Sequence, residues 1–359
     1  MVAYIREMAV TRYKWLDEEK FKDGVALCQA IPGATAMQTA AYVGLRARGI
    51  AGALTSFVGF GLPAFILMVV LSSLYSRYHD VPRIISVFQG LQVVVVAIVA
   101  NATYSFGNST LKNFRDVIFA ITASILLWTG LSPFIVIFGA VLIGIIFLNG
   151  KGIIPEPTVE RETEGYSVKQ LSMILFILLL GLLMLYLIDT KIFDLAVLMM
   201  RIDIFAFGGG FASIPLMLHE IVNVRGWMDS KTFMDGIALG QVTPGPIVIT
   251  STFVGYMLYG LSGAIVASGA IFTPSLLMVI LVTPVFDTLK TSAYFTGVTK
   301  GVLATFVGLL FYVTMKFGFA VQWDIIRAVL AGVAFAALVK KVDILYVVLV
   351  AAFISAFTL

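Results

Sequence analysis

Charged residues are scarce in this sequence. Asp, Glu, Lys and Arg together make up 12% of the 359 residues, whereas hydrophobic residues make up 60%, and the mean hydropathy is +1.01. Soluble globular proteins carry roughly twice this share of charge, so the surface of this protein has to face lipid. The composition predicts a polytopic membrane protein. Alternating strand patterns of about ten residues are absent, so we expect an all-α fold.

Residues that perform chemistry in enzymes and metal sites are also few. Cys28 is the only cysteine, which excludes an internal disulfide and a cysteine-based zinc site. The stretch GLSG (260–263) resembles the serine motif of rhomboid-type intramembrane proteases, whose histidine base lies on a later helix. Here both histidines, His79 and His219, precede Ser262, and no pair of carboxylates lies within an apolar run. We expect no enzymatic activity, catalytic residue, cofactor or metal site.

The net charge of +4 does not indicate a nucleic-acid partner. Basic residues occur singly or in small groups in the short connections between apolar runs: Arg46, Arg48, Arg77, Arg83, Lys112, Arg115, Lys340 and Lys341. This distribution is typical of loops that orient membrane helices. The expected partner is the lipid bilayer, with no nucleic acid.

Long apolar runs indicate the membrane segments. Uncharged stretches occur at 49–76, 84–111, 117–150, 171–188, 236–286 and 344–359. A bilayer-spanning helix needs about 20 residues, so the third and fifth runs are long enough for two passes each. The turns that divide them are WTGLSP (128–133) and YGLSG (259–263). We expect roughly ten to twelve membrane elements.

The chain contains an internal duplication. Residues 15–39 match residues 227–251 at a constant offset of 212, with ten identities that include Trp, Asp, Phe, Gln, Pro and Gly. Beyond them the offset becomes 211, and it aligns Gly44, Gly49, Gly52, Ala53 and Pro63 with Gly255, Gly260, Gly263, Ala264 and Pro274. A chance match of two apolar segments would share Leu and Val instead. The sequence therefore predicts two homologous repeats.

The duplication also defines the domain organisation. We expect a first repeat over 1–149, a polar linker over 150–170, a connecting helix over 171–191 and a second repeat over 192–359. Each repeat should hold about five or six membrane helices. If every membrane segment crosses fully, the second repeat is inverted relative to the first. If the Pro-Gly segments are re-entrant hairpins, each repeat loses one crossing and the two repeats are parallel. We favour inversion, because paired broken helices around a central site suit alternating access.

Each repeat interrupts an apolar helix in the same way. The first carries CQAIPGAT (28–35) and the second GQVTPGPI (240–247), with Gln29 and Gln241 before the Pro-Gly step. In lipid such a break survives only when it is buried in protein or lines a cavity. The half-helix after it begins with free N–H groups and a positive dipole end, which suit an anion. Two matched breaks favour a binding site over simple kinks.

A second glycine-rich stretch, FAFGGGFASIP (205–215), precedes the second repeat's Trp-containing loop. Three glycines expose backbone amides or admit a close helix approach, and helix packing is the alternative interpretation. At the offset of 212, Met1 pairs with Ser213. The partner of this stretch would therefore precede Met1, so we expect the first repeat to lack its opening helix and a true start to lie upstream.

These motifs together resemble the chromate ion transporter family in its duplicated form. FGGG, the Trp-containing loop, GQVTPGPI, STFVGY and a helix with a central proline (IFTPS, 271–275) follow the family's pattern over nearly the whole chain. The resemblance implies an inner-membrane protein of bacteria or archaea that exports chromate, with sulfate as a similar oxyanion. One departure is Ala34, where a second proline is usual. The binding residues expected from the motifs, with Lys300 added as a membrane cation, are Gln29, Pro32, Gly33, Thr35, Gly208, Gly209, Gly210, Gln241, Thr243, Pro244, Gly245, Pro246 and Lys300.

Three charged residues lie near apolar segments. Lys300 stands alone in the run 294–315, where a cation either serves the site or extends to the interface. Arg201 and Asp203 are two residues apart, a spacing that does not bring helical side chains together. We interpret them as a helix-end boundary rather than a proton relay.

The sequence thus predicts a secondary transporter that exports chromate or a sulfate-like divalent oxyanion. Paired half-helix ends would hold the anion with backbone amides and Gln and Thr side chains. A passive oxyanion channel is the alternative, because channels and carriers use the same kind of helix-end site. A homodimer is compatible with these observations.

Overall fold

The computed structural model describes residues 1–147, 168–286 and 293–358, and every regular element in these ranges is a helix. Four helical segments are long and apolar enough to cross a membrane. They are centred on α3 (Thr35–Tyr78), α4 (Pro82–Thr110), α11 (Thr250–Val282) and α13 (Ala293–Ala320). This confirms the all-α polytopic membrane fold.

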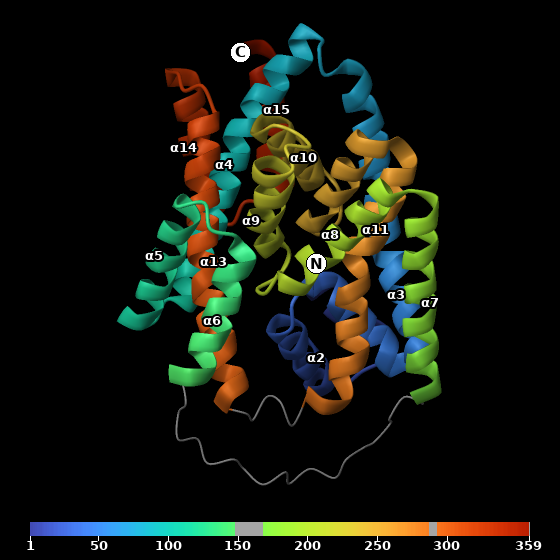
Figure 1. Cartoon of the computed structure of the whole chain (residues 1–359). Coiled ribbons are helices and arrows are strands. Elements are labelled where there is room, and N and C mark those ends of the chain that lie inside the picture. The colour runs from blue at the N-terminus through green and yellow to red at the C-terminus, as the bar shows by residue number, and fades with distance from the viewer. Residues whose placement is uncertain (148–167, 287–292, 359) are drawn as a thin grey trace.

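The remaining elements are shorter, and in the view of Figure 1 several of them lie between the long helices. In chain order they are α1 (Val2–Arg6), η1 (Glu7–Arg12), α2 (Glu18–Ala30), α5 (Phe114–Trp128), α6 (Pro133–Phe147), α7 (Val168–Ile188), α8 (Thr190–Phe205), η2 (Gly210–Ala212), α9 (Ser213–Met217), η3 (Leu218–Val224), α10 (Ser230–Val242), η4 (Ile247–Ile249), η5 (Thr283–Val285), α14 (Ile325–Val339) and α15 (Ile344–Thr358). The turns predicted at 128–133 and 259–263 are confirmed as the α5–α6 connection and a kink in α11.

The two repeats correspond element by element. Both α2 and α10 have 13 residues, and each begins at an aspartate whose side chain caps the first turn. Asp17 accepts a hydrogen bond from Lys20 N, and Asp229 accepts one from Thr232 N, both over 2.7 Å. Such caps stabilise a helix by about 1 kcal/mol. The shared cap fixes where the half-helix before each break begins.

Each repeat then folds its next helix back on itself at a glycine. Gly49 in α3 has φ +62° and Gly260 in α11 has φ +60°, a conformation that favours glycine. Two further glycines, one on each side of the kink, face each other: a β-carbon on Gly44 would lie 2.2 Å from Gly52 O. Gly255 and Gly263 repeat this contact at 2.2 Å. The absence of side chains lets the short returning arm and the long crossing arm touch.

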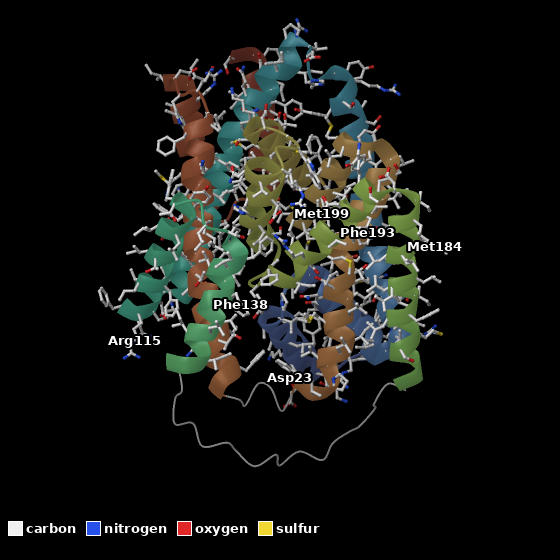
Figure 2. The ribbon with its side chains drawn as sticks, viewed as in Figure 1. Asp23, Arg115, Phe138, Met184, Phe193 and Met199 are labelled. Carbon is white, nitrogen blue, oxygen red and sulfur yellow. The ribbon has the colours of Figure 1, made fainter. Side chains whose placement is uncertain are left out.

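The repeats are inverted relative to each other. In Figure 1, α2 lies near the bottom of the view and α10 near the top. The crossing arm of α3 ends at the top, where α4 begins, whereas α11 ends at the bottom. Figure 2 places Asp23 of α2 at the lower end of the molecule. Inversion is therefore the observed arrangement.

Re-entrant breaks and inversion occur together, so the predicted link between re-entrant breaks and parallel repeats was wrong. The helices α5, α6, α14 and α15 have 15 residues each. A helix of this length spans about 22 Å, less than the hydrocarbon core of about 30 Å. The α5–α6 pair therefore does not cross fully, and the segments that run from one end of the molecule to the other between α2 and α10 are the long arm of α3, α4 and α7. Their number is odd, which inverts the second repeat.

The connecting helix is α7, at the edge of the molecule. Figure 2 shows Met184 of α7 pointing outward, whereas Met199 of α8 lies inside. Met184 is half exposed and Met199 fully buried. The predicted linker 150–170 lies outside the described residues except for its last three, which belong to α7. The exact domain boundaries stay a prediction.

The inverted arrangement predicts opposite accessibility for two equivalent surface residues. Glu19 on α2 and Lys231 on α10 are both exposed and do not cap their helices. In a Cys28→Ala background, Glu19→Cys and Lys231→Cys should react with a membrane-impermeant maleimide from opposite sides, measured in right-side-out and inside-out vesicles. Labelling of both from one side would contradict the inverted fold.

Candidate functional site

The first break, at residues 31–34, is buried against the crossing arm of the second repeat. A β-carbon on Gly33 would lie 1.9 Å from Ser275 Oγ, and Gly33 adopts φ +117°. Gly33 N–H donates to Ala206 O over 3.0 Å, and Ala34 N–H donates to Ser275 Oγ over 3.3 Å. Only glycine satisfies both the backbone angle and the close contact at this position.

The second break, at residues 243–246, makes the reciprocal contact with the first repeat. A β-carbon on Gly245 would lie 2.5 Å from the β-carbon of Ala64. Ala64 follows Pro63 just as Ser275 follows Pro274, and the two pairs are equivalent in the repeats. Each break therefore packs on the proline-containing middle of the other repeat's crossing helix.

The glycine loop at 208–210 connects the two breaks. A β-carbon on Gly209 would lie 3.3 Å from Thr35 Oγ1, at the start of α3. One on Gly210 would lie 3.1 Å from Ile247 Cγ2 and 3.7 Å from Ile247 N, at the start of η4. Three helical segments, beginning at Thr35, Gly210 and Ile247, thus start next to one another.

None of these three helix starts has a side-chain cap. Their N-cap residues are Ala34, Gly209 and Pro246, which have no side-chain acceptor to offer. Each uncapped helix end carries about half a positive charge and several N–H groups without a helical partner. Within the described residues, the site thus presents backbone donors and a positive potential without a metal-binding cluster. This arrangement suits a tetrahedral oxyanion.

The two predicted glutamines lie in different environments. Gln241 is partly buried, and its Nε2 is inaccessible and has no hydrogen-bond partner. Gln29 is exposed. At the first break the backbone is held instead by Gln38, whose Nε2 donates to Pro32 O over 2.6 Å. Gln38 is completely buried and its Oε1 has no partner. The sequence did not predict Gln38, which lies one turn into α3.

The remaining predicted residues divide between the cluster and its margin. Thr243 is buried, and its hydroxyl donates to Gly240 O over 2.8 Å, so it closes the end of α10. Pro244 is exposed and Pro32 is buried. Lys300 on α13 has an exposed side chain, with no hydrogen bond or ion pair within the described part of the chain. It lies one turn from Leu303, the residue nearest to an added β-carbon on Gly208.

Asp203 is the acidic residue of this cluster. Its side chain is 1% exposed. Ser275 N–H donates to Asp203 Oδ2 over 2.7 Å, and the Ser275 hydroxyl donates to Oδ1 over 2.9 Å. The prediction of a helix end is confirmed, because α8 ends two residues later. The spacing argument did not anticipate that Asp203 reaches Ser275 on α11. The sequence signal available for this contact was Ser275 itself, a polar residue directly after Pro274 in an apolar helix.

Arg201 has a separate role from Asp203. Arg201 and Arg225 both pair with the buried carboxylate of Glu220. A second buried carboxylate, Asp235 on α10, accepts hydrogen bonds from Tyr75 Oη and Gln92 Nε2, each over 2.8 Å. Neither carboxylate shares a hydrogen bond with the break residues in the described chain. These clusters tie helices together away from the helix starts.

Comparison with known proteins identifies the same family as the sequence motifs. The profile of the family described as Chromate transporter matches residues 1–145 and, separately, residues 193–356. The double match confirms the duplication. No solved structure matches this chain.

Three relatives match over most of their length. An uncharacterized transporter of Methanocaldococcus jannaschii is 44% identical over 97% of this chain and 87% of its own length. A chromate transport protein of Cupriavidus metallidurans is 28% identical over 95% of this chain and 83% of its own. A probable chromate transport protein of Synechococcus elongatus is 27% identical over 86% of this chain and 78% of its own.

The contact between Gly33 and Ser275 predicts a position-specific cost. Gly33→Ala adds a clash, worth about 1–3 kcal/mol, to backbone strain of about 1–3 kcal/mol. Gly49→Ala is the control, because Gly49 also has positive φ but has nothing within 4 Å of an added β-carbon. We expect Gly33→Ala to lower the thermal unfolding midpoint more than Gly49→Ala and to abolish anion exchange. Equal effects of the two variants would contradict this assignment.

Proposed function

The chain belongs to the chromate transporter family, and from this membership and its site we propose that it is a secondary transporter that exports chromate. The substrate class is the tetrahedral divalent oxyanion, sulfate included. The membrane is the cytoplasmic membrane of a prokaryotic cell. The observation that carries the proposal is the meeting of three uncapped helix starts at Thr35, Gly210 and Ile247.

Backbone amides at helix starts are suitable ligands for a transported dianion. They supply directional donors and partial positive charge without a full cation. A site built from arginines would bind the dianion tightly and release it slowly, whereas dispersed amide donors bind with moderate affinity. The partnerless Nε2 of Gln241 offers one further donor beside the second break. The exposed Lys300 supplies positive charge at the margin.

The reciprocal packing of the breaks supports a carrier mechanism. Each break rests on the other repeat's crossing helix, through Gly33 on Ser275 and Gly245 on Ala64. Movement of one repeat relative to the other therefore changes both halves of the site together. Inverted repeats with broken helices at their interface are typical of alternating-access transporters.

The membrane potential favours export of an anion. An inside-negative potential is worth about 2.3 kcal/mol per charge per 100 mV, so a dianion that leaves alone gains about 4.6 kcal/mol. This free energy supports a gradient of roughly three decades. Expulsion of chromate therefore needs no energy input from a nucleotide.

Replacement of Gln241 tests the binding site. A hydrogen bond to a charged acceptor contributes about 1.5–3 kcal/mol, so Gln241→Ala should weaken apparent affinity by roughly ten- to a hundredfold. The measurement is the half-saturating concentration in counterflow of labelled chromate into proteoliposomes. Gln29→Ala, at the equivalent exposed position, should have a smaller effect. An unchanged affinity in well-expressed Gln241→Ala would show that Gln241 does not contact the anion.

Expression in a chromate-sensitive cell tests the direction of transport. The protein should lower accumulated chromate and raise tolerance, because the potential drives the dianion outward. Replacement of Pro244, Gly245 and Pro246 by alanine should abolish both effects while the protein stays in the membrane, because a continuous helix removes the free amides at Ile247. Equal accumulation with and without the protein, together with no flux in energised vesicles, would refute chromate transport. Linear flux without counterflow would indicate a channel.

A further inference from the structure

Asp203 creates an electrostatic conflict inside the proposed site. Its carboxylate is 1% exposed and receives two hydrogen bonds from Ser275. The same Ser275 hydroxyl accepts the Ala34 N–H at the start of α3. Three residues after Asp203, the carbonyl oxygen of Ala206 accepts a hydrogen bond from Gly33 N–H. A carboxylate is therefore bound, through one serine, to the helix start that would receive a dianion.

Among the described residues, no cation forms an ion pair with this carboxylate. The helix α11 carries no charged residue between Thr250 and Val282, and α9 carries none. Charged residues are also absent from residue 170 to the end of α7 and from the first break. On α8 itself, Arg201 pairs with Glu220, and His219 lies beside that pair. Asp203 thus has hydrogen-bond donors but no counter-charge within the described chain.

A bound dianion and an ionised Asp203 would repel each other strongly at this depth. Water cannot screen charges inside the protein as it does at a surface, so unit charges several ångströms apart interact by several times the thermal energy. A buried carboxylate near a like charge takes up a proton instead. With the site empty, in contrast, the ionised carboxylate balances the positive helix start.

We propose that Asp203 takes up one proton when the oxyanion binds and releases it when the oxyanion leaves, so that each transported dianion is accompanied by a proton. The proton binds a carboxylate oxygen of Asp203, no bond to the oxyanion forms, and the net charge moved is one rather than two. This inference rests on the proposed function and names its coupling ion. The sequence analysis interpreted Asp203 as part of a helix-end boundary rather than a proton relay, and this proposal departs from that interpretation.

The second break has no equivalent of this polar link among the described residues. The equivalent of Ser275 in the first repeat is Ala64, which has no hydroxyl, and Gly245 of the second break packs on its β-carbon. The first break is therefore connected to a carboxylate through Ser275, whereas the second break packs on an apolar side chain.

The charge carried per chromate ion tests this proposal. Proteoliposomes are clamped at a known potassium diffusion potential, at an alkaline pH at which chromate is the fully deprotonated dianion. At 100 mV, one net charge supports a chromate gradient of roughly 50-fold and two charges roughly 2,000-fold. We expect the unaltered protein to give the smaller gradient and to move protons with chromate, as reported by an internal pH dye.

Asp203→Asn mimics the protonated carboxyl, so the exchange that this variant supports should give the larger gradient and move no protons. Asp235→Asn is the matched control, because Asp235 is also buried and hydrogen-bonded but lies away from the helix starts; it should behave as the unaltered protein. If Asp203→Asn does not fold, Ser275→Ala serves instead. It removes the hydroxyl that links Asp203 to Ala34 and should shift the pH dependence of exchange.

Three results would overturn the proposal. The first is a two-charge gradient without proton movement in the unaltered protein. The second is one proton per chromate in Asp203→Asn, or, where that variant does not fold, an unshifted pH dependence in Ser275→Ala. The third is loss of proton coupling in Asp235→Asn as well. Failure of chromate transport itself is a different outcome: the unaltered protein would show no counterflow at any pH, and both proposals would be refuted.

Discussion

The structure depends on how two broken helices satisfy their backbone groups at a depth where water is scarce. An unpaired amide there costs several kcal/mol, so each break must be covered by protein. Gly33 N–H is paired with Ala206 O and Ala34 N–H with Ser275 Oγ. The donors that remain, at the starts of three helices, converge on one place. The N–H groups at these three uncapped helix starts are therefore the donors that the site offers to a ligand.

Reciprocal contacts connect this constraint to the inverted architecture. Each break packs on the proline-containing segment of the other repeat, so neither repeat can form its half of the site alone. Glycine is needed at both contacts, since an added β-carbon would overlap Ser275 in one case and Ala64 in the other. The same steric requirement recurs at the kinks, where paired glycines allow the short and long arms of α3 and α11 to touch.

The two halves of the site have nevertheless diverged. The second break keeps both prolines, whereas the first has Ala34 in place of the second one. Ala34 has a backbone N–H, which proline lacks, and this N–H is the one that binds the Ser275 hydroxyl. The substitution that looked like a departure from the family pattern therefore provides the link to Asp203. The two breaks therefore pack in the same way, but the first break also has a polar link through Ser275 to Asp203.

The sequence by itself determined the membrane class, the duplication and the positions of both breaks. These are properties of composition, of apolar run length and of local residues such as Pro and Gly, which act on the backbone wherever they stand. It also located the glycine loop at 208–210 and the turns at 128–133 and 259–263, for the same local reason.

Only the tertiary structure decided which residues meet. Ser275 lies more than 200 residues from Gly33 and 72 residues from Asp203, and no periodicity within one helix encodes such contacts. It also distinguished a buried, partnerless Gln241 from an exposed Gln29, although both occupy the same place in their motifs. Inversion likewise depended on which segments cross fully, because run length in the sequence does not separate a full crossing from a short helical pair. Burial and long-range contact arise from packing, so identical local patterns acquired different roles.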